Sequence, residues 1–283
     1  MGDPWALQIL KETFLGVRRF QDFQTRLGIT RQTLVLRLNR FTDHALLYKA
    51  PARHKRLVYE YRLTPKGADL YAFILMVWRW HRRWHLEESL LPEALYHRPC
   101  RQLLNPVLGC GHCQAPLLPE DVRLTPGRGA ELPAEESGRK TRILNELERF
   151  GADHLSTIVI GDCWSVMVLT AVLRGVQNYD ASRKSLQISS NGQSSRLKTR
   201  VAQDLLCPEQ NPQDRRKISY RATEKGRDVF PMLISLMQWG DRWLAGANGP
   251  PDVLWHDGCG HILEPLLYCD YCKERVRRED VGF

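Results

Sequence analysis

The stretch "FLGVRRFQDFQTRLGITRQTLVLRL", residues 14–38, decides the fold of the first part of the chain. Gly28 supplies a turn near its middle, and Thr30 is a good N-cap for the helix that follows. On both sides of this turn apolar residues recur at helical spacing, at Phe20, Phe23, Leu27, Leu34, Leu38 and Phe41. Two short helices joined by a tight turn that contains glycine form a helix-turn-helix.

The residues on either side complete a winged helix. Asp3 followed by Pro4 marks the start of an earlier helix. The segment "LVYEYRL" (57–63) alternates in hydrophobicity, as a half-buried strand does, and can pair with an earlier strand near residues 46–50. Threonine and proline at 64–65 then start a longer apolar helix. Helix, helix-turn-helix, hairpin and helix, in this order, describe a winged helix.

The chain contains this unit twice. One constant offset, which takes residue 2 to residue 161, aligns copy one (2–122) with copy two (161–281) without a gap. We therefore expect a mainly α fold with a small β content (α+β), built as tandem winged helix-turn-helix domains, each followed by a small zinc-ribbon-like tail. The expected boundaries are 1–86 for the first winged helix, 87–122 for tail one, 123–142 for a linker rich in Pro, Gly and charge, 143–247 for the second winged helix and 248–283 for tail two.

Each tail carries the pattern H-x2-C-x9-C-x2-C, in "HRPCRQLLNPVLGCGHC" (97–113) and "HDGCGHILEPLLYCDYC" (256–272). In a reducing compartment such cysteines argue for metal or free thiols rather than disulfides. Three sulfurs and one imidazole can close a tetrahedron around zinc, and four protein ligands leave no open position, which favours a structural ion. We expect one zinc ion per tail, held by His97, Cys100, Cys110 and Cys113 in tail one and by His256, Cys259, Cys269 and Cys272 in tail two.

A thiol or redox switch, or inert thiols, remain alternatives to zinc. His112 could replace His97 as a ligand in tail one, but the equivalent residue of tail two is Tyr271, which argues against it. Cys163 and Cys207 lie outside the pattern. Cys163 is expected to be a packed thiol, and Cys207 is followed by Pro208 and has no nearby basic pair.

The charge of the chain favours an anionic partner. Its formal net charge is +9, and residues 18–66 hold twelve Lys and Arg against three Asp and Glu. A helix-turn-helix places its second helix in the major groove, where Arg reads guanine and Gln reads adenine, so double-stranded DNA is the expected partner. The residues expected to face bases are Thr30, Arg31, Gln32 and Val35. Those expected to contact phosphates are Arg18, Arg19 and the cations of the hairpin tip, Arg53, Lys55 and Arg56.

Copy two is altered where DNA should be read. Gln187 stands at the position of the turn glycine, and Gly192 lies inside the third helix, where glycine costs about 1 kcal/mol relative to alanine. We expect copy two to bind the DNA backbone or to act as a dimer partner, with weak base reading. Its candidate DNA-binding cations are Arg183, Lys184, Arg215, Arg216 and Lys217.

The first copy resembles the HxlR-type family of bacterial winged-helix transcriptional regulators through "GDPWALQIL", the opening stretch, "EYRLTPKGADL" and "WRWHRRW". The second copy resembles it through "GDCW", "ISYRATEKGRDVFP" and "MQWGDRWL". The resemblance implies sequence-specific DNA binding, usually as a dimer held by terminal helices, and no enzymatic activity. Because one chain holds two winged helices, we expect an intramolecular pseudo-dimer, with an ordinary homodimer as the alternative.

Other classes of protein fit less well. The longest apolar stretch, "AFILMVW" (72–78), is far too short to span a membrane, and a leader sequence is lacking, so we expect a bacterial cytoplasmic, nucleoid-associated protein. The sequence has no Gly-rich phosphate loop, nucleophile elbow or paired-carboxylate site, which argues against an enzyme. The leading hypothesis is a transcriptional regulator, most simply a repressor. The alternative is a zinc-stapled protein–protein adaptor, or a thiol- or redox-responsive regulator, that has lost base-specific DNA reading.

Overall fold

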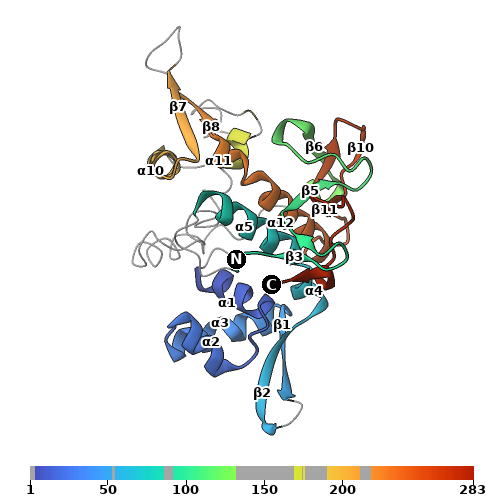
Figure 1. Ribbon diagram of the computed structural model, residues 1–283. Helices are drawn as coiled ribbons and strands as arrows, with labels where there is room; N and C mark the ends of the chain where they lie inside the picture. Colours follow the sequence, from blue (N-terminus) through green and yellow to red (C-terminus); the bar gives the residue numbers. More distant parts are fainter. Residues whose placement is uncertain are drawn as a thin grey trace. The chain divides into compact units, whose positions relative to one another are not determined.

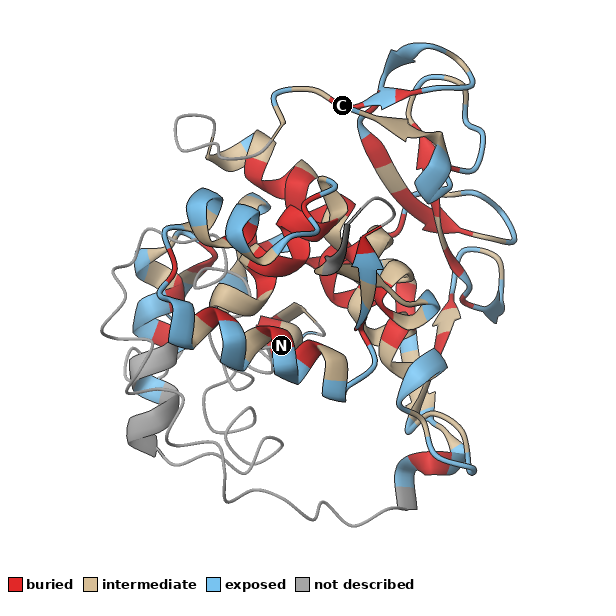
Figure 2. Ribbon diagram, turned by 90° about the horizontal axis from the view of Figure 1, so that it is seen from below, coloured by how far each residue is buried: buried red, intermediate tan, exposed pale blue. Residues whose placement is uncertain are grey.

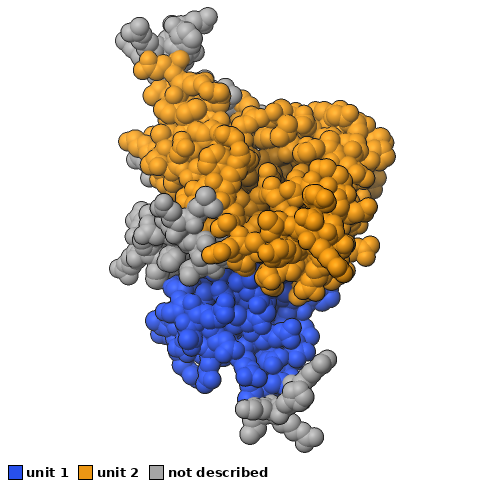
Figure 3. Space-filling view, viewed as in Figure 1, with its two compact units in different colours: residues 1–71, 138–162 blue, residues 72–137, 163–283 orange. Residues whose placement is uncertain are grey.

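The computed structural model describes a large part of the chain, in two compact units (Figure 3). Unit 1 comprises Met1–Tyr71 and Gly138–Asp162, and unit 2 comprises Ala72–Ser137 and Cys163–Phe283. The residues described are 4–52, 55–85, 92–131, 169–173, 175, 190–210 and 218–283. None of the helices within these ranges is long and apolar enough to cross a membrane.

The described part of unit 1 is the winged helix of copy one up to Tyr71 (Figure 1). The two strands of its hairpin are antiparallel, with Leu47 opposite Leu63, and they form the wing. The expected order of elements is confirmed. Its elements are α1 (Pro4–Phe14), α2 (Phe20–Leu27), α3 (Arg31–Asp43), β1 (Leu47–Ala52), β2 (Lys55–Leu63) and α4 (Pro65–Ala68).

Local chemistry sets the turn of the helix-turn-helix. Gly28 ends α2 with φ 61°, a left-handed conformation that glycine adopts without steric cost. Thr30 caps α3, because its side chain accepts a hydrogen bond from the backbone N–H of Thr33. The apolar stripe between the helices is buried, including Phe23, Leu34, Leu38 and Phe41. Figure 2 shows buried positions interleaved with exposed ones along the helices, as packing on one side requires.

The prediction of one longer helix from residue 64 is wrong in one respect, because the structure divides this segment into two helices, α4 and α5 (Tyr71–Trp84). Thr64 caps α4 by accepting a hydrogen bond from the N–H of Gly67. A Cβ on Gly67 would lie 2.0 Å from the carbonyl oxygen of Leu46, so the helix starts pressed against the backbone that precedes β1. The turn then tightens, and the N–H of Leu70 bonds to the carbonyl of Gly67 three residues back.

Unit 2 repeats the second half of this winged helix in copy two. Each repeated element lies at the repeat offset from its counterpart in copy one, and α10, which contains Gly192, has the same thirteen-residue length as α3. The elements are α10 (Ser190–Ala202), β7 (Leu206–Gln210), β8 (Ile218–Ala222), α11 (Glu224–Arg227) and α12 (Phe230–Trp243). From Ala72 on, α5 also belongs to unit 2.

The two tails share their sheets (Figure 1). The sheets have the strand orders β11-β5, β10-β9-β6 and β12-β3-β4, and each combines strands from both tails. Two small independent tail folds were expected, and the pairing of strands across the copies corrects this. The strands are β3 (Tyr96–His97), β4 (Gln102–Leu103), β5 (Pro106–Cys110), β6 (Val122–Pro126), β9 (Asp252–His256), β10 (His261–Ile262), β11 (Pro265–Cys269) and β12 (Val281–Gly282). The 3-10 turns are η2 (Pro119–Asp121), η3 (Arg128–Glu131) and η4 (Arg278–Asp280).

Strand β6 also runs into the segment expected to be a linker. Residues 122–126 pair with β9 from Val122 opposite His256 to Pro126 opposite Asp252. The Pro and Gly content of the segment predicts a linker rather than a strand. The partner strand β9 belongs to the other copy, so the pairing leaves no local signal in the sequence.

Candidate DNA-binding face and metal-binding groups

The outward side of α3 is the candidate DNA-binding face in unit 1. Arg31, Gln32 and Val35 are exposed, whereas Leu34 and Leu38 on the opposite side of the helix are buried. Thr30 is exposed too, but its hydroxyl is engaged as the N-cap. We call Arg31, Gln32 and Val35 the reading face.

Three further outward residues of α3 escaped the sequence reasoning. Leu36 is 49% exposed, and Asn39 and Arg40 are exposed as well. Helical spacing could have found them, since positions 36 and 39 lie four residues after Gln32 and Val35.

Residues of α2 and the wing support the reading face. The guanidinium of Arg31 lies over the ring of Phe20 at 5.4 Å, a cation–π contact that restrains its direction. Arg18 and Arg19 are exposed just before α2, and the carbonyl of Arg18 accepts a hydrogen bond of 2.8 Å from the N–H of Tyr61 on β2. This bond fixes the start of α2 against the wing.

The wing itself carries exposed cationic and aromatic groups. Lys49 on β1 lies over the ring of Tyr59 on β2 at 4.6 Å, and both residues are exposed. A hydrogen bond from Arg62 and its positive charge hold the pKa of Glu60 below the ordinary value, with further help from Arg18 and Arg19. Arg53 and the side chains of Lys55 and Arg56 lie outside the described residues.

Copy two lacks a comparable described face. All five of its candidate cations, Arg183, Lys184, Arg215, Arg216 and Lys217, lie outside the described residues. At the position of the buried Phe41, copy two has Arg200, which is only 2% exposed and donates to the side-chain oxygen of Gln203 at 2.7 Å. The repeat offset shows this replacement of a core aromatic by a cation, and the sequence reasoning missed it.

The eight predicted metal ligands form two groups, each of which could hold a metal ion. Within each group the candidate ligand atoms all lie within 4.8 Å of one another. The first metal group is His97, Cys100, Cys269 and Cys272. The second metal group is Cys110, Cys113, His256 and Cys259. The expected arrangement of one complete site per tail is therefore wrong, because each group takes two ligands from each tail.

The pairing of β5 with β11 explains the exchange. These strands are antiparallel, with Cys110 opposite Pro265 and Cys269 opposite Pro106. The end of each strand, which carries the C-x2-C pair, is therefore brought to the start of the other strand. In that other tail, only the short strand β4 or β10 and its flanking residues separate this start from the H-x2-C turn. Figure 1 shows the two strands side by side.

The spacing inside the groups suits a tetrahedral cation. The sulfurs of Cys100 and Cys269 are 3.9 Å apart, and those of Cys110 and Cys259 are 3.8 Å apart. The Nδ1 atom of His97 lies 3.2 Å from the sulfur of Cys100 and 3.3 Å from that of Cys272. A tetrahedral zinc separates such ligand atoms by about 3.6–3.8 Å, whereas a disulfide brings two sulfurs to about 2 Å.

Burial and hydrogen bonding adapt the groups to this task. His97 and His256 are 0% and 2% exposed, so each imidazole is enclosed by protein. Burial opposes ionisation of the Cys110 thiol, but backbone N–H groups of Cys113 and His112 stabilise its thiolate and lower its pKa from the ordinary value. A metal-ligating cysteine must be a thiolate, so these donors favour binding.

The other histidine and cysteine candidates lie outside both groups. His112 packs on His261 with ring centroids 3.5 Å apart, and it does not take the place of His97. Cys207 is half-buried, and its thiol donates to the carbonyl of Arg221 at 3.4 Å. Cys163 lies outside the described residues.

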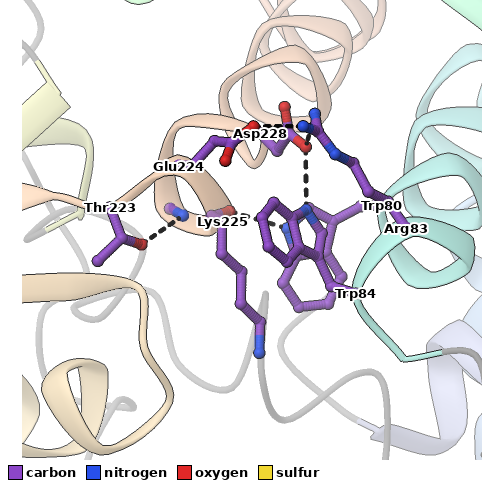
Figure 4. A network of polar contacts seen from close by, with 8 residues as sticks. Trp80, Arg83, Trp84, Thr223, Glu224, Lys225 and Asp228 are labelled. Atoms are coloured by element: carbon purple, nitrogen blue, oxygen red, sulfur yellow. Dashed lines mark hydrogen bonds and ion pairs between the residues drawn. The ribbon is translucent and has the colours of Figure 1, made fainter.

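A second contact between the copies joins α5 to α11 (Figure 4). The indole N–H of Trp80 donates to the carbonyl of Lys225 at 3.0 Å, and that of Trp84 donates to the carboxylate of Asp228 at 2.9 Å. Arg83 lies between Asp228, at 2.7 Å, and Glu224. Trp80 and Trp84 of α5 thus join copy one to copy two.

Comparison with known proteins agrees with the duplication. The HxlR-like helix-turn-helix family matches residues 1–89 and again residues 159–248, together more than half of the chain. Uncharacterized HTH-type transcriptional regulators of Mycobacterium bovis and Mycobacterium tuberculosis are each 34% identical to this chain over 123 residues, or 44% of this chain and 78% of the relative.

Two solved structures are also similar in part. The transcription-factor candidate PA1607 is 29% identical, with a TM-score of 0.39 over 44% of this chain and 87% of that protein. A second, PA1374 from Pseudomonas aeruginosa, is 25% identical, with a TM-score of 0.31 over 40% and 78%. With its helix-turn-helix elements and two family matches, the chain belongs to the HxlR-like helix-turn-helix family of transcriptional regulators and carries the family's domain twice.

Proposed function

We propose that this protein binds a specific DNA sequence through α3 and the wing of copy one and regulates transcription, most simply as a repressor. The observation that carries the proposal is the reading face, where Arg31, Gln32 and Val35 are exposed on a helix whose other side is buried. The second helix of a helix-turn-helix enters the major groove with its N-terminal residues at base edges, and these residues lie in the first two turns of α3.

Each side chain of this surface has a distinct task. Arg31 suits the O6 and N7 atoms of guanine, Gln32 suits the N6 and N7 atoms of adenine, and Val35 suits a thymine methyl group. Arg18 and Arg19, with the wing cations, suit phosphates, which fix the register of the protein without reading sequence. Phe20 keeps Arg31 in place for its contact.

We infer that each metal group holds one structural zinc ion. Three thiolates and one imidazole form a donor set that zinc prefers, and four protein ligands close the coordination shell. Two buried histidines whose Nδ1 atoms lie 3.2–3.4 Å from cysteine sulfurs of both tails support this assignment.

We further infer that one chain acts as a pseudo-dimer with a lopsided operator. The shared sheets of the tails and the contact of α5 with α11 join the copies within one chain. Copy one would read its half-site stringently, and copy two would tolerate sequence variation, because its third helix differs from α3 at the reading positions.

Selection of bound fragments from genomic DNA, followed by titration of single variants, tests the proposal. Gln32→Ala should weaken the selected site by about 1–3 kcal/mol and relax the base preference at one position, while binding of random DNA changes little. Gln102→Ala, at an exposed tail position, is the matched control and should change neither. Failure to select any sequence, at any salt concentration, would contradict the proposal and favour the adaptor function.

A further inference from the structure

The two metal groups are related by the internal repeat and are both shared between the copies. Every ligand of the first metal group has its repeat counterpart in the second metal group. The tail-one ligands of one group correspond to the tail-two ligands of the other. Neither copy by itself therefore supplies more than half of either site. Whatever binds in the groups must bind to both copies at once.

We propose that the two metal ions act as a clasp that fastens copy one to copy two, so that metal occupancy decides whether both winged helices of one chain act on DNA as a single unit. This inference rests on the metal binding and DNA binding proposed above. It adds a function to the ions, since they would control DNA binding as well as stabilise the tails.

The strands alone offer little to hold the tails together. The β5–β11 and β6–β9 ladders have only five residue pairs each, and strands β3, β4, β10 and β12 have only two residues each. A two-stranded ladder is marginal by itself in water, and small folds of this kind depend on a metal or a disulfide. Because the ligands come from different copies, the free energy of metal binding acts on the joining of the copies.

The contact of α5 with α11 does not replace the clasp. Trp80 is buried there, but the ion pairs of Arg83 with Asp228 and Glu224 involve an arginine that is 45% exposed, and exposed pairs contribute little. We therefore expect this contact to hold the copies weakly when the metal is absent. The described residues of unit 1, 4–52 and 55–71, include no member of either metal group, so its reading face should keep its structure without metal.

Loss of the clasp has a defined consequence for DNA binding. Two winged helices that are held together bind adjacent half-sites with a high effective concentration, which is lost when one of them swings on a long tether. Binding would then fall toward the affinity of copy one for its own half-site. The affinity for an isolated half-site under copy one should not change.

Cleavage of the full chain between the copies tests the clasp without DNA. A protease recognition sequence is inserted after Ser137, the purified zinc-loaded protein is cut, and association of the two pieces is measured by sedimentation over a range of concentrations. The pieces should stay together with zinc and should associate at least about 100-fold more weakly after chelation under reducing conditions. The Cys207→Ser variant, which removes a cysteine outside both groups, is the control and should behave like the parent protein.

The uncut chain supplies the DNA measurement. Removal of zinc should weaken binding to the full site about 10- to 100-fold and leave the half-site of copy one unchanged. The clasp would be overturned if the two pieces associate equally well with and without zinc. It would also be overturned if the affinity for the full site is the same with and without zinc. Zinc-dependent association in a protein that binds no DNA at all would support the clasp between the copies and contradict the proposed function instead.

Discussion

Leu108 on β5 lies opposite Leu267 on β11, and Leu267 is the residue that the repeat offset assigns to Leu108. A residue that pairs with its own counterpart marks a local two-fold axis. The other pairs obey the same symmetry, since Val107 lies opposite Tyr268 and Gly109 lies opposite Leu266. The tails therefore meet in the way in which two identical chains would meet in a symmetric dimer.

The axis predicts equal energetic roles for its two leucines. Leu108 and Leu267 are 2% and 1% exposed, so Leu108→Ala and Leu267→Ala should each lower the free energy of unfolding of the zinc-loaded protein by about 2–5 kcal/mol. Chemical denaturation of both variants measures this. Leu103→Ala, at a position 61% exposed, should change stability by less than about 0.5 kcal/mol. Clearly unequal costs at 108 and 267 would contradict the symmetric interface.

Glycines offer a second test of the duplicated winged helix. A Cβ at Gly67 would lie 2.0 Å from the carbonyl oxygen of Leu46, and a Cβ at Gly226 would lie 2.0 Å from that of Leu205. Alanine at either position should destabilise the protein by about 1–3 kcal/mol, because the backbone must shift. Gly240 lies within α12 with nothing near a new Cβ, so Gly240→Ala should instead stabilise by about 0.5–1 kcal/mol. Thermal unfolding compares the three variants, and destabilisation by Gly240→Ala would refute this account of the packing.

Phosphate-binding residues should differ from base-reading residues in their response to salt. Arg53→Ala or Lys55→Ala in the wing should weaken binding to every DNA sequence alike. The negative slope of log K against log salt concentration should become less steep by about 0.9 for each lost contact. Arg31→Ala should instead discriminate, and cost about 1–3 kcal/mol on the specific site. Fluorescence anisotropy at several salt concentrations measures both quantities. Equal losses on specific and random DNA for all three variants would refute the division of roles.

If the operator is lopsided, grafting the α3 residues of copy one into copy two should make the preferred DNA site more symmetric. Replacing "ISSNGQSSRL" (188–197) with "ITRQTLVLRL" (29–38), together with Arg200→Phe, gives copy two the third-helix residues of copy one, including the core aromatic. The preferred site should then shift toward a palindrome, which sequencing of selected DNA would reveal. An unchanged site preference in a folded graft would show that copy two does not contact bases.

The sequence was sufficient for the winged helix because its signals are local. Glycine at 28, the threonine cap at 30 and the period of the apolar residues fix α2 and α3 without reference to the rest of the chain. The repeat offset then placed the elements of copy two, including α10, whose glycine weakens the local signal. The break between α4 and α5 was missed because it depends on the carbonyl of Leu46, which meets Gly67 only in the folded protein.

The ligands of the metal groups were also predictable, but their grouping was not. Spacing within one tail shows which residues lie in the same turn, such as His97 with Cys100, and this was correct. It cannot show which turn faces which, because that depends on the pairing of β5 with β11, two strands that lie a full repeat apart in the sequence. Because the two tails carry the same motif, the sequence fits two arrangements equally well: one metal site within each tail, or two sites that each take two ligands from each tail.

Counting zinc in two matched double variants tests the exchanged arrangement most directly. Cys113 and Cys272 occupy equivalent positions of the two tails, and the structure places only Cys272 in the group of Cys100. The parent protein should carry about two zinc ions per chain. Cys100→Ser with Cys272→Ser should spoil one group and leave about one ion, whereas Cys100→Ser with Cys113→Ser should spoil both groups and leave about none. The reverse result, with one ion in the Cys113 variant and none in the Cys272 variant, would mean that each tail binds its own metal and would contradict the account.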